Sequence, residues 1–290
     1  MKRLRIIIIL FSIAVFAVFA FKSVQERLTS DYVSPVIHAE YDAIQASVSV
    51  TDQELLTGLT ASDNLDGDVT DSLVVVSKSK FIFRGMRRVR YAAFDKNNNV
   101  GVYERMLTYT DYVSPHFSLS QPLRFVDGNS DVDYLKNFTA YDCLDGDISK
   151  QIMITYGDSR RISDTTKSQT INLQVTNSAG DTATLQLEAL RQDYTSFNQY
   201  APSLSAYLVY TDIGQSLTLS SYVNGIWTGN TVRTFSDTGY DPNTDVSIDS
   251  SSVNYNAPGV YPVQFQLSHL KKDGVREYLG SNTLFVVVEG

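Results

Sequence analysis

The sequence predicts an all-β chain of tandem β-sandwich modules that follow a single N-terminal transmembrane helix. Three observations lead to this prediction. The chain begins with a short basic segment and a long apolar run. Its later segments alternate apolar and polar residues, and one acidic motif, called the acidic phrase below, occurs twice. Alternation with a period of two is typical of strands in half-buried sheets, and repetition at a fixed offset indicates duplicated modules.

The first element is an export signal. Three cations lie within residues 1–5, and an uncharged apolar run of sixteen residues extends from Ile6 to Phe21. This run spans roughly 24 Å as a helix, and the stem of Lys22 can extend it toward the ~30 Å hydrocarbon core. The cleavage consensus around residues 18–20 is poor. We therefore expect residues 1–27 to be a cytoplasmic tip and membrane anchor, with a cleaved signal as the alternative, and the C-terminal region to be extracellular.

A repeated phrase defines the modules. Residues 60–70 read TASDNLDGDVT and residues 139–149 read TAYDCLDGDIS, an offset of 79. The shorter phrase DYVSP at 31–35 returns at 111–115, an offset of 80. Near-equal offsets indicate duplication of a whole module. The predicted modules are 31–110, 111–192 and a diverged third at 200–290, with 191–200 as a flexible joint.

Short alternating runs between Gly, Asn and Asp turns predict the strands. An alternating strand, a polar turn and a second strand also predict a β-hairpin that closes each of the first two modules. In the third module, alternate residues from Gly259 to Leu267 are predicted to share one face. The example strands are Val36–Tyr41, Phe81–Phe83, Val89–Phe94, Ile152–Tyr156, Thr170–Val175 and Thr184–Leu190.

These motifs carry a family resemblance. Asp-x-x-Asp-Gly-Asp followed by Val-Thr at 63–70, and Pro-Gly-x-Tyr-x-Val at 258–263, resemble the bacterial surface immunoglobulin-like domains, which also occur in pesticidal crystal proteins. The first module departs from the pattern at 84–87, and the second lacks the Gly of that segment. The resemblance implies tandem immunoglobulin-like β-sandwiches strung on bacterial surface proteins, and it implies no activity.

Composition argues against several kinds of partner and site. Five of the 24 cations and one of the 32 anions lie in residues 1–27, which leaves a net charge of −12 on the remainder. An acidic body disfavours nucleic acid and anionic lipid surfaces as partners. The single cysteine, Cys143, rules out an intramolecular disulfide, and the three histidines are scattered without the spacing of a metal site.

The repeated acidic phrase is the leading candidate for a cation site. Three carboxylates within six residues could supply oxygens to Ca²⁺, while Asp-Gly is also a favoured turn dipeptide and Asp commonly caps backbone N–H groups. Both interpretations stay open, and no cofactor other than this Ca²⁺ is expected. The candidate ligands are Asp63, Asp66, Asp68 and Asp95 in the first module and Asp142, Asp145 and Asp147 in the second, where Asn177 takes the Asp95 position.

Two further features are candidates. Residues 127–133 imitate the start of an EF-hand loop, but Val132 and Phe138 stand where that loop requires Gly and Glu, which favours a solvated hairpin loop. Trp227, the only tryptophan, lies between Gly and Asn residues. It is expected either to anchor the core or to contact a ligand.

The sequence contains none of the common hydrolase or nucleotide-binding motifs, and an acidic phrase written twice suits a structural device better than a catalytic cleft. We therefore expect a non-enzymatic bacterial cell-surface protein, a membrane-anchored stalk with a structural or adhesive role. Its expected partners are the membrane, through residues 6–21, and a cell-wall glycan or another surface protein. The alternatives are a cell-wall carbohydrate-binding protein and an accessory extracellular hydrolase.

Overall fold

The computed structural model describes residues 2–29, 31–128, 132–197, 199–229 and 231–290. The chain divides into two compact units, Met1–Tyr112 and Val113–Gly290. The division falls inside the second DYVSP phrase, so the first unit contains the N-terminal helix and the first module, and the second unit contains both later modules.

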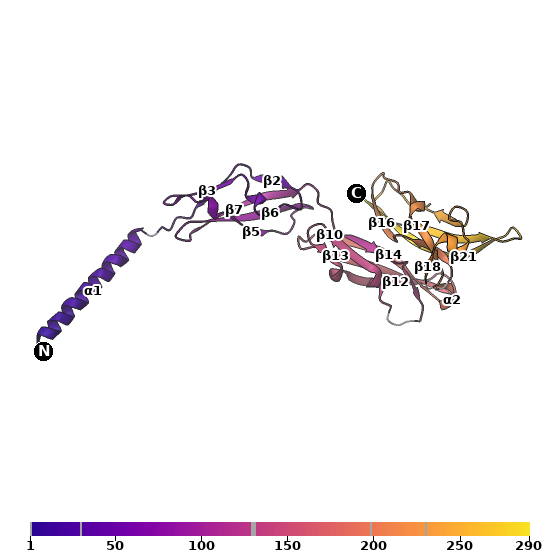
Figure 1. Cartoon of the computed structure of the whole chain (residues 1–290), viewed down its shortest axis with the longest axis horizontal. Coiled ribbons are helices and arrows are strands. Elements are labelled where there is room, and N and C mark those ends of the chain that lie inside the picture. Colours follow the sequence, from indigo (N-terminus) through magenta and orange to yellow (C-terminus); the bar gives the residue numbers. More distant parts are fainter. Residues whose placement is uncertain (1, 30, 129–131, 198, 230) are drawn as a thin grey trace. The chain divides into compact units, whose positions relative to one another are not determined.

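The N-terminal element is the long helix α1, Lys2–Thr29 (Figure 1). Its segment Ile7–Gln25 is long and apolar enough to cross a membrane, and none of that segment is buried against the rest of the protein. Signal peptides have the same length and composition. The helix therefore agrees with both alternatives raised by the sequence, a signal anchor and a signal peptide.

The first module is a pair of sheets, one with strand order β1-β3-β4 and one with order β2-β7-β6-β5. Short 3₁₀ turns, Glu54–Leu56 and Thr70–Ser72, lie between strands. The strands are β1 Val36–Ala39, β2 Ala43–Ala46, β3 Leu59–Asp63, β4 Gly67–Asp68, β5 Val74–Lys78, β6 Met86–Phe94 and β7 Val100–Tyr109.

The second module repeats this plan, with sheets β11-β10-β8 and β12-β13-β14-β9. Its 3₁₀ turns, Tyr134–Asn137 and Ser149–Gln151, follow the same strands as those of the first module. The strands are β8 His116–Leu119, β9 Arg124–Val126, β10 Phe138–Asp142, β11 Gly146–Asp147, β12 Met153–Arg161, β13 Thr166–Thr176 and β14 Thr182–Gln192.

The third module has sheets β15-β17-β18 and β16-β21-β20-β19, joined to the second through the short helix α2, Tyr194–Phe197. A 3₁₀ turn, Leu219–Tyr222, and the helix α3, Phe235–Thr238, complete it. The strands are β15 Ala201–Leu204, β16 Leu208–Asp212, β17 Val223–Trp227, β18 Val232–Arg233, β19 Val246–Asp249, β20 Gly259–Leu270 and β21 Arg276–Glu289.

All three modules share one topology. The second strand of each pairs in parallel with the last, as β2 with β7, β9 with β14 and β16 with β21. The last two strands of each form the long antiparallel hairpin that the sequence predicted for the first two modules. The predicted fold class, tandem β-sandwiches after one apolar helix, is confirmed, and the third module keeps the fold although it lacks the acidic phrase.

The alternating pattern determines which residues enter the core. In β20, Val263, Phe265 and Leu267 are fully buried, as predicted, while their neighbours are exposed or half-buried. One predicted strand is wrong. Phe81–Phe83 contributes only an isolated bridge from Phe83 to Met86, because the chain turns at Gly85, whose φ of +72° ends any extended run.

The second and third modules share a continuous hydrophobic core. Phe117 and Leu119 of β8 belong to the same buried cluster as Leu208 of β16 and Phe285 of β21. The backbone N–H of Tyr207 also donates to the Leu119 carbonyl at 3.2 Å. The two modules therefore form one body, which explains why they fall into a single compact unit.

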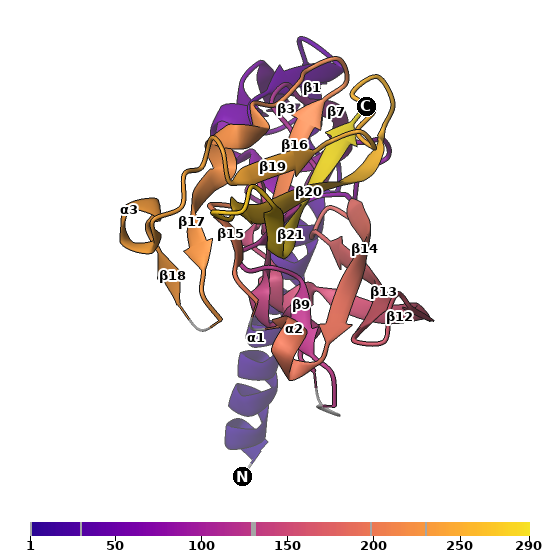
Figure 2. The ribbon, with the colours of Figure 1, turned by 90° about the vertical axis from the view of Figure 1, so that its right-hand side faces the viewer.

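Arg124 holds the link between these modules. Its Nη2 donates to the Ser196 and Phe197 carbonyls of α2 at 3.1 and 3.0 Å, and its Nη1 donates to Asn282 of β21 at 2.9 Å. Figure 2 shows β9, which carries Arg124, beside α2. Burial lowers the pKa of Arg124 from its ordinary value. One guanidinium therefore bonds both to β21 and to Gln192, Ser196 and Phe197 of the predicted flexible joint at 191–200, of which residue 198 lies outside the described residues.

A second polar contact joins the same two modules. His116 Nε2 lies 2.9 Å from Oε2 of Glu289, and the His116 ring stacks on Tyr210 with centroids 4.1 Å apart. The Tyr210 hydroxyl accepts the Phe117 backbone N–H at 3.0 Å, and burial raises the pKa of Tyr210 to about 12. The neutral phenol is therefore part of the interface at physiological pH.

Candidate functional site

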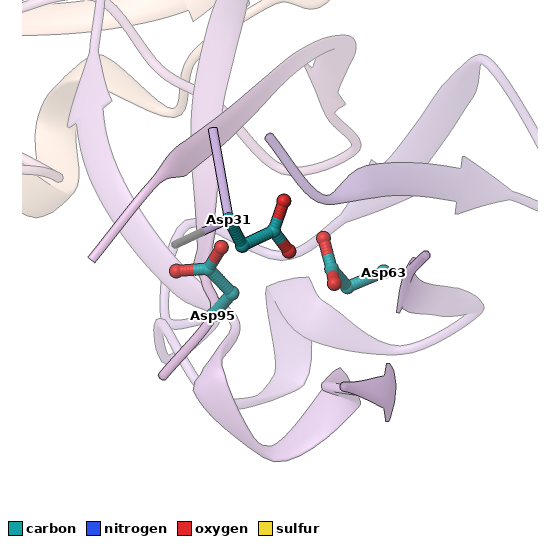
Figure 3. Close-up of side chains that lie close together, drawn as sticks. All are labelled: Asp31, Asp63 and Asp95. Carbon is teal, nitrogen blue, oxygen red and sulfur yellow. The ribbon is translucent and has the colours of Figure 1, made fainter. Parts of the chain in front are cut away.

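Three carboxylates of the first unit converge at one end of the module. Asp31, Asp63 and Asp95 each place one oxygen within 4.8 Å of the other two. Figure 3 shows the Asp31 carboxylate between those of Asp63 and Asp95. Asp31 is only 8% exposed and Asp95 only 6%. Within the described residues, no Lys, Arg or His forms an ion pair with any of the three.

The turn after β3 fixes Asp63. Its Oδ2 accepts the backbone N–H groups of Leu65 at 2.8 Å and Asp66 at 3.0 Å. The bonds from Asp66 and then Leu65 lower the pKa of Asp63, because they stabilise the ionised form. Its Oδ1 is buried and, in the described part of the chain, accepts no hydrogen bond. The turn therefore orients one free oxygen toward the cluster.

Asp31 is oriented in the same way from the segment that follows α1. Its Oδ1 accepts the Val33 N–H at 3.0 Å, while its Oδ2 is buried and accepts no hydrogen bond from any described residue. The Asn99 side chain links Asp31 to Asp95. Its Nδ2 lies 3.0 Å from the Asp31 carbonyl oxygen and 2.6 Å from Asp95 Oδ2. The chain that leaves the helix is thereby held against the β6–β7 turn.

The structure does not bring every candidate of the first phrase into this cluster. Asp66 turns away and pairs with Lys96, accepting its backbone N–H at 2.8 Å and its Nζ at 2.9 Å, and this contact lowers the pKa of Asp66. Asp68 accepts the Thr70 N–H at 2.9 Å, and the hydroxyl and N–H of Thr70 lower the pKa of Asp68. Asp68 is thus the capping group that the sequence offered as the alternative, whereas Asp66 forms an ion pair with a residue of the β6–β7 turn.

In the second copy of the phrase, each of the three carboxylates accepts hydrogen bonds from protein donors. Asp142 is buried, and its Oδ1 accepts the N–H groups of Leu144 and Asp145 as Asp63 does. Its Oδ2 accepts Nδ2 of Asn177 at 3.0 Å. Asp145 accepts the N–H and hydroxyl of Ser178. Asp147 accepts the Ser149 N–H, and the Ser149 hydroxyl and N–H lower its pKa.

Residues 129–131, in the middle of the EF-hand-like stretch, lie outside the described residues. Asp127 forms ion pairs with Lys167 and Arg191 at 2.8 and 3.2 Å. Asp133 caps the following 3₁₀ turn by accepting the Leu135 N–H at 3.0 Å. The described acids at its two ends are therefore engaged in structural contacts.

A cavity of about 630 Å³ lies between the second and third modules, and Trp227 lines it. Trp227 is half-buried, so one part of its ring system packs against the protein and another part is exposed. The lining combines aromatic rings with polar side chains, a composition that suits small-molecule and sugar pockets. Its other members include Phe125, Phe197, Gln121, Asp133, Lys136 and Asn137.

Sequence reasoning missed Asp31, although the signal was present. Asp31 opens the first DYVSP phrase, which served only to set the module offset. Its counterpart Asp111 is bonded instead to Ser47 and Val48 of the first module. Arg124 was also missed, since nothing in its local sequence distinguishes it from a surface cation.

Comparison with known proteins leaves the family open, and no family model matches the chain. An uncharacterised 81.3 kDa protein of Acholeplasma phage L2 is 28% identical over 168 residues, which cover 57% of this chain and 20% of that protein. The match thus spans about a fifth of its length.

Solved structures show distant likeness. The CBM51-2 and INT domains of Clostridium perfringens ZmpB, in complex with GlcNAc, are 15% identical over 55% of this chain and 41% of that one, with a TM-score of 0.22. Mouse cadherin-23 EC22-24 is 10% identical over 88% of this chain and 99% of that one, with a TM-score of 0.21. These similarities assign no ligand, activity or family, and the chain stands as tandem β-sandwich modules of extracellular type behind an apolar helix.

Proposed function

We propose that this chain is a non-enzymatic, membrane-anchored protein of the bacterial cell surface, a stalk of immunoglobulin-like modules with a structural or adhesive role. The acidic phrase and the closing hairpins support the family assignment, because they match the pattern of bacterial surface immunoglobulin-like domains. The helix α1 supplies the anchor, and the acidic modules supply a body that stays solvated outside the membrane.

The observation that carries this proposal is the fusion of the second and third modules. Because the two sandwiches share a core and are joined by Arg124, we expect them to move together. Most domains within one chain meet through smaller, more polar contacts and move relative to each other. A rigid two-module body is the form expected of a spacer that holds a binding surface away from a membrane.

The side chains also support a non-catalytic role. In the cavity beside Trp227, the carboxylate of Asp133 caps a turn and Arg124 is engaged by backbone carbonyls. A general base or nucleophile needs a free lone pair and a partner that orients it. Among the described lining residues, Asp133 is the only carboxylate and no histidine, serine or cysteine accompanies it, whereas the aromatic and amide side chains supply surfaces for binding.

The anchor is tested by expressing the full chain in a bacterium and fractionating the cells. We expect an intact mass of 32.3 kDa, resistance to carbonate extraction and digestion of residues 31–290 by protease added to whole cells. Ile13→Asp with Phe16→Asp should release the protein from the membrane, because each charge costs about 3 kcal/mol within a spanning helix. Phe11→Leu is the matched apolar control. A soluble product shortened near residue 20 would contradict the anchor.

The Trp227 cavity favours carbohydrate binding as a second candidate function. Tryptophan stacks on the apolar faces of sugar rings, and Lys136 and Asn137 could donate to hydroxyl groups. On an array of bacterial cell-wall glycans, the detergent-solubilised full chain should bind a subset of sugars, and Trp227→Ala should reduce that binding at least about tenfold. Tyr141→Ala, an exposed aromatic outside the cavity, is the control. Equal binding by both variants would exclude this site.

A further inference from the structure

We propose that Asp31, Asp63 and Asp95 bind one Ca²⁺ ion, and that this ion ties the segment leaving helix α1 to the first module. The site lies in one unit and involves neither the Trp227 cavity nor the contact between the later modules. Cation binding here is therefore independent of the proposed surface role, and each can fail without the other.

The first support is an excess of buried negative charge. Three carboxylates within 4.8 Å of one another repel, and no described cation pairs with them. Oδ2 of Asp31 and Oδ1 of Asp63 are both buried and accept no hydrogen bond from the described residues. Asp31 is more than nine-tenths buried, so water does not compensate that oxygen freely. A bound cation satisfies these oxygens and removes the repulsion together.

The geometry and chemistry of the group select Ca²⁺. Ligand oxygens lie 2.3–2.6 Å from Ca²⁺, so two oxygens on one ion are at most about 5.2 Å apart, and the observed 4.8 Å limit satisfies this. The group offers carboxylates only, without the His or Cys ligands that Zn²⁺ prefers. All three come from a loop or a strand end, which suits the flexible coordination of Ca²⁺ better than the strict octahedron of Mg²⁺.

The second module is a natural comparison. In the β6–β7 turn of the first module, Asp95 comes first and Asn99 fifth, while the β13–β14 turn has Asn177 first and Asp181 fifth. This exchange of Asp and Asn converts a carboxylate beside the phrase into an amide, and the amide donates to Asp142. In the second module this turn therefore supplies an amide hydrogen-bond donor at the position where the first module has the Asp95 carboxylate.

The position of the ligands gives the ion a mechanical role. Asp31 is the second residue after the end of α1, Asp63 ends β3, and Asp95 begins the turn between β6 and β7. The β3 and β6 strands belong to the two different sheets of the sandwich. One ion at this point would join both sheets to the chain segment that emerges from the helix.

The test uses the full chain in detergent micelles with CaCl₂ as the probe. We expect isothermal titration to give one Ca²⁺ per chain, with binding evident at about 1 mM, where extracellular calcium modules bind. Hydrogen–deuterium exchange should slow on addition of Ca²⁺ in residues 31–35, 60–68 and 94–99. It should not slow in 139–149, and MgCl₂ at the same concentration should not reproduce the protection.

Variants separate cation binding from folding. Asp31→Asn and Asp63→Asn keep the local hydrogen bonds, so each should weaken Ca²⁺ binding at least about tenfold. In EDTA both should be no less stable than the original chain, because a repulsive charge is removed. Asp68→Asn, in the same phrase but outside the cluster, should bind Ca²⁺ normally. The proposal is overturned if the original chain shows no heat and no protection, if Mg²⁺ protects equally, or if Asp31→Asn retains full binding.

Discussion

Replacing Arg105 with alanine should lower the free energy of unfolding of the first unit by about 4 kcal/mol. Arg105 is 2% exposed in the middle of β7. Its Nη1 donates to the Thr57 carbonyl at 3.1 Å, its Nη2 donates to the Leu55 carbonyl, and its guanidinium lies 5.0 Å from the centre of the Tyr91 ring. Alanine leaves two carbonyls without their donor and a cavity beside Tyr91.

The two units can be followed separately in this experiment. Trp227 is the only tryptophan and lies in the second unit, so its fluorescence during urea unfolding should not change in Arg105→Ala. Hydrogen exchange of residues 86–109 should report the loss in the first unit. Arg90→Ala, an exposed cation on the neighbouring strand, should change stability by less than about 0.5 kcal/mol. Similar losses for the two variants would show that Arg105 does not support the core.

Replacing Arg124 with alanine should destabilise the second unit by about 3–5 kcal/mol. The change removes the guanidinium donors that bond to α2 and β21, and it leaves the carbonyls of Ser196, Phe197 and Ser281 to find other partners. Since the two modules share a core, weakening the link should lower the urea midpoint of Trp227 fluorescence for the whole second unit.

Arg124→Lys and Arg161→Ala are the matched comparisons. Lysine keeps the charge but cannot reproduce the forked geometry of the guanidinium, so it should recover less than half of the loss. Arg161 forms an exposed pair with Asp164, and its removal should have almost no effect. If Arg124→Ala left the Trp227 transition unchanged, Arg124 would not be the group that holds the two modules together.

Most of the fold was predictable because its signals are local. Alternation along β13 and β20, the polar turns and the apolar run of α1 each lie within a short window, where the period alone indicates the structure. The prediction failed at Phe81–Phe83, where three apolar residues suggested a strand. The backbone of Gly85 and the rings around Phe81 decided otherwise.

The candidate site was only half predictable. Asp63 was a candidate because it lies in the repeated acidic phrase, and Asp95 because it was expected to lie near that phrase once the sheets pack. Asp66 and Asp68 lie in the same phrase, but the structure engages Asp66 in an ion pair with Lys96 and Asp68 in a capping bond to Thr70. The spacing of residues in the sequence does not determine which carboxylate oxygens accept hydrogen bonds from backbone N–H groups. Asp31 lies 32 residues before Asp63, and only the pairing of β1 with β3 brings the two together.

The sequence by itself determined the number of modules, their sandwich class and the apolar helix in front of them, because periodicity and repetition are properties of neighbouring residues. Only the tertiary structure decided that the second and third modules form one body and that one of the two acidic phrases meets a third carboxylate. Both depend on contacts between residues far apart in the chain, which are set when sheets pack and strands pair.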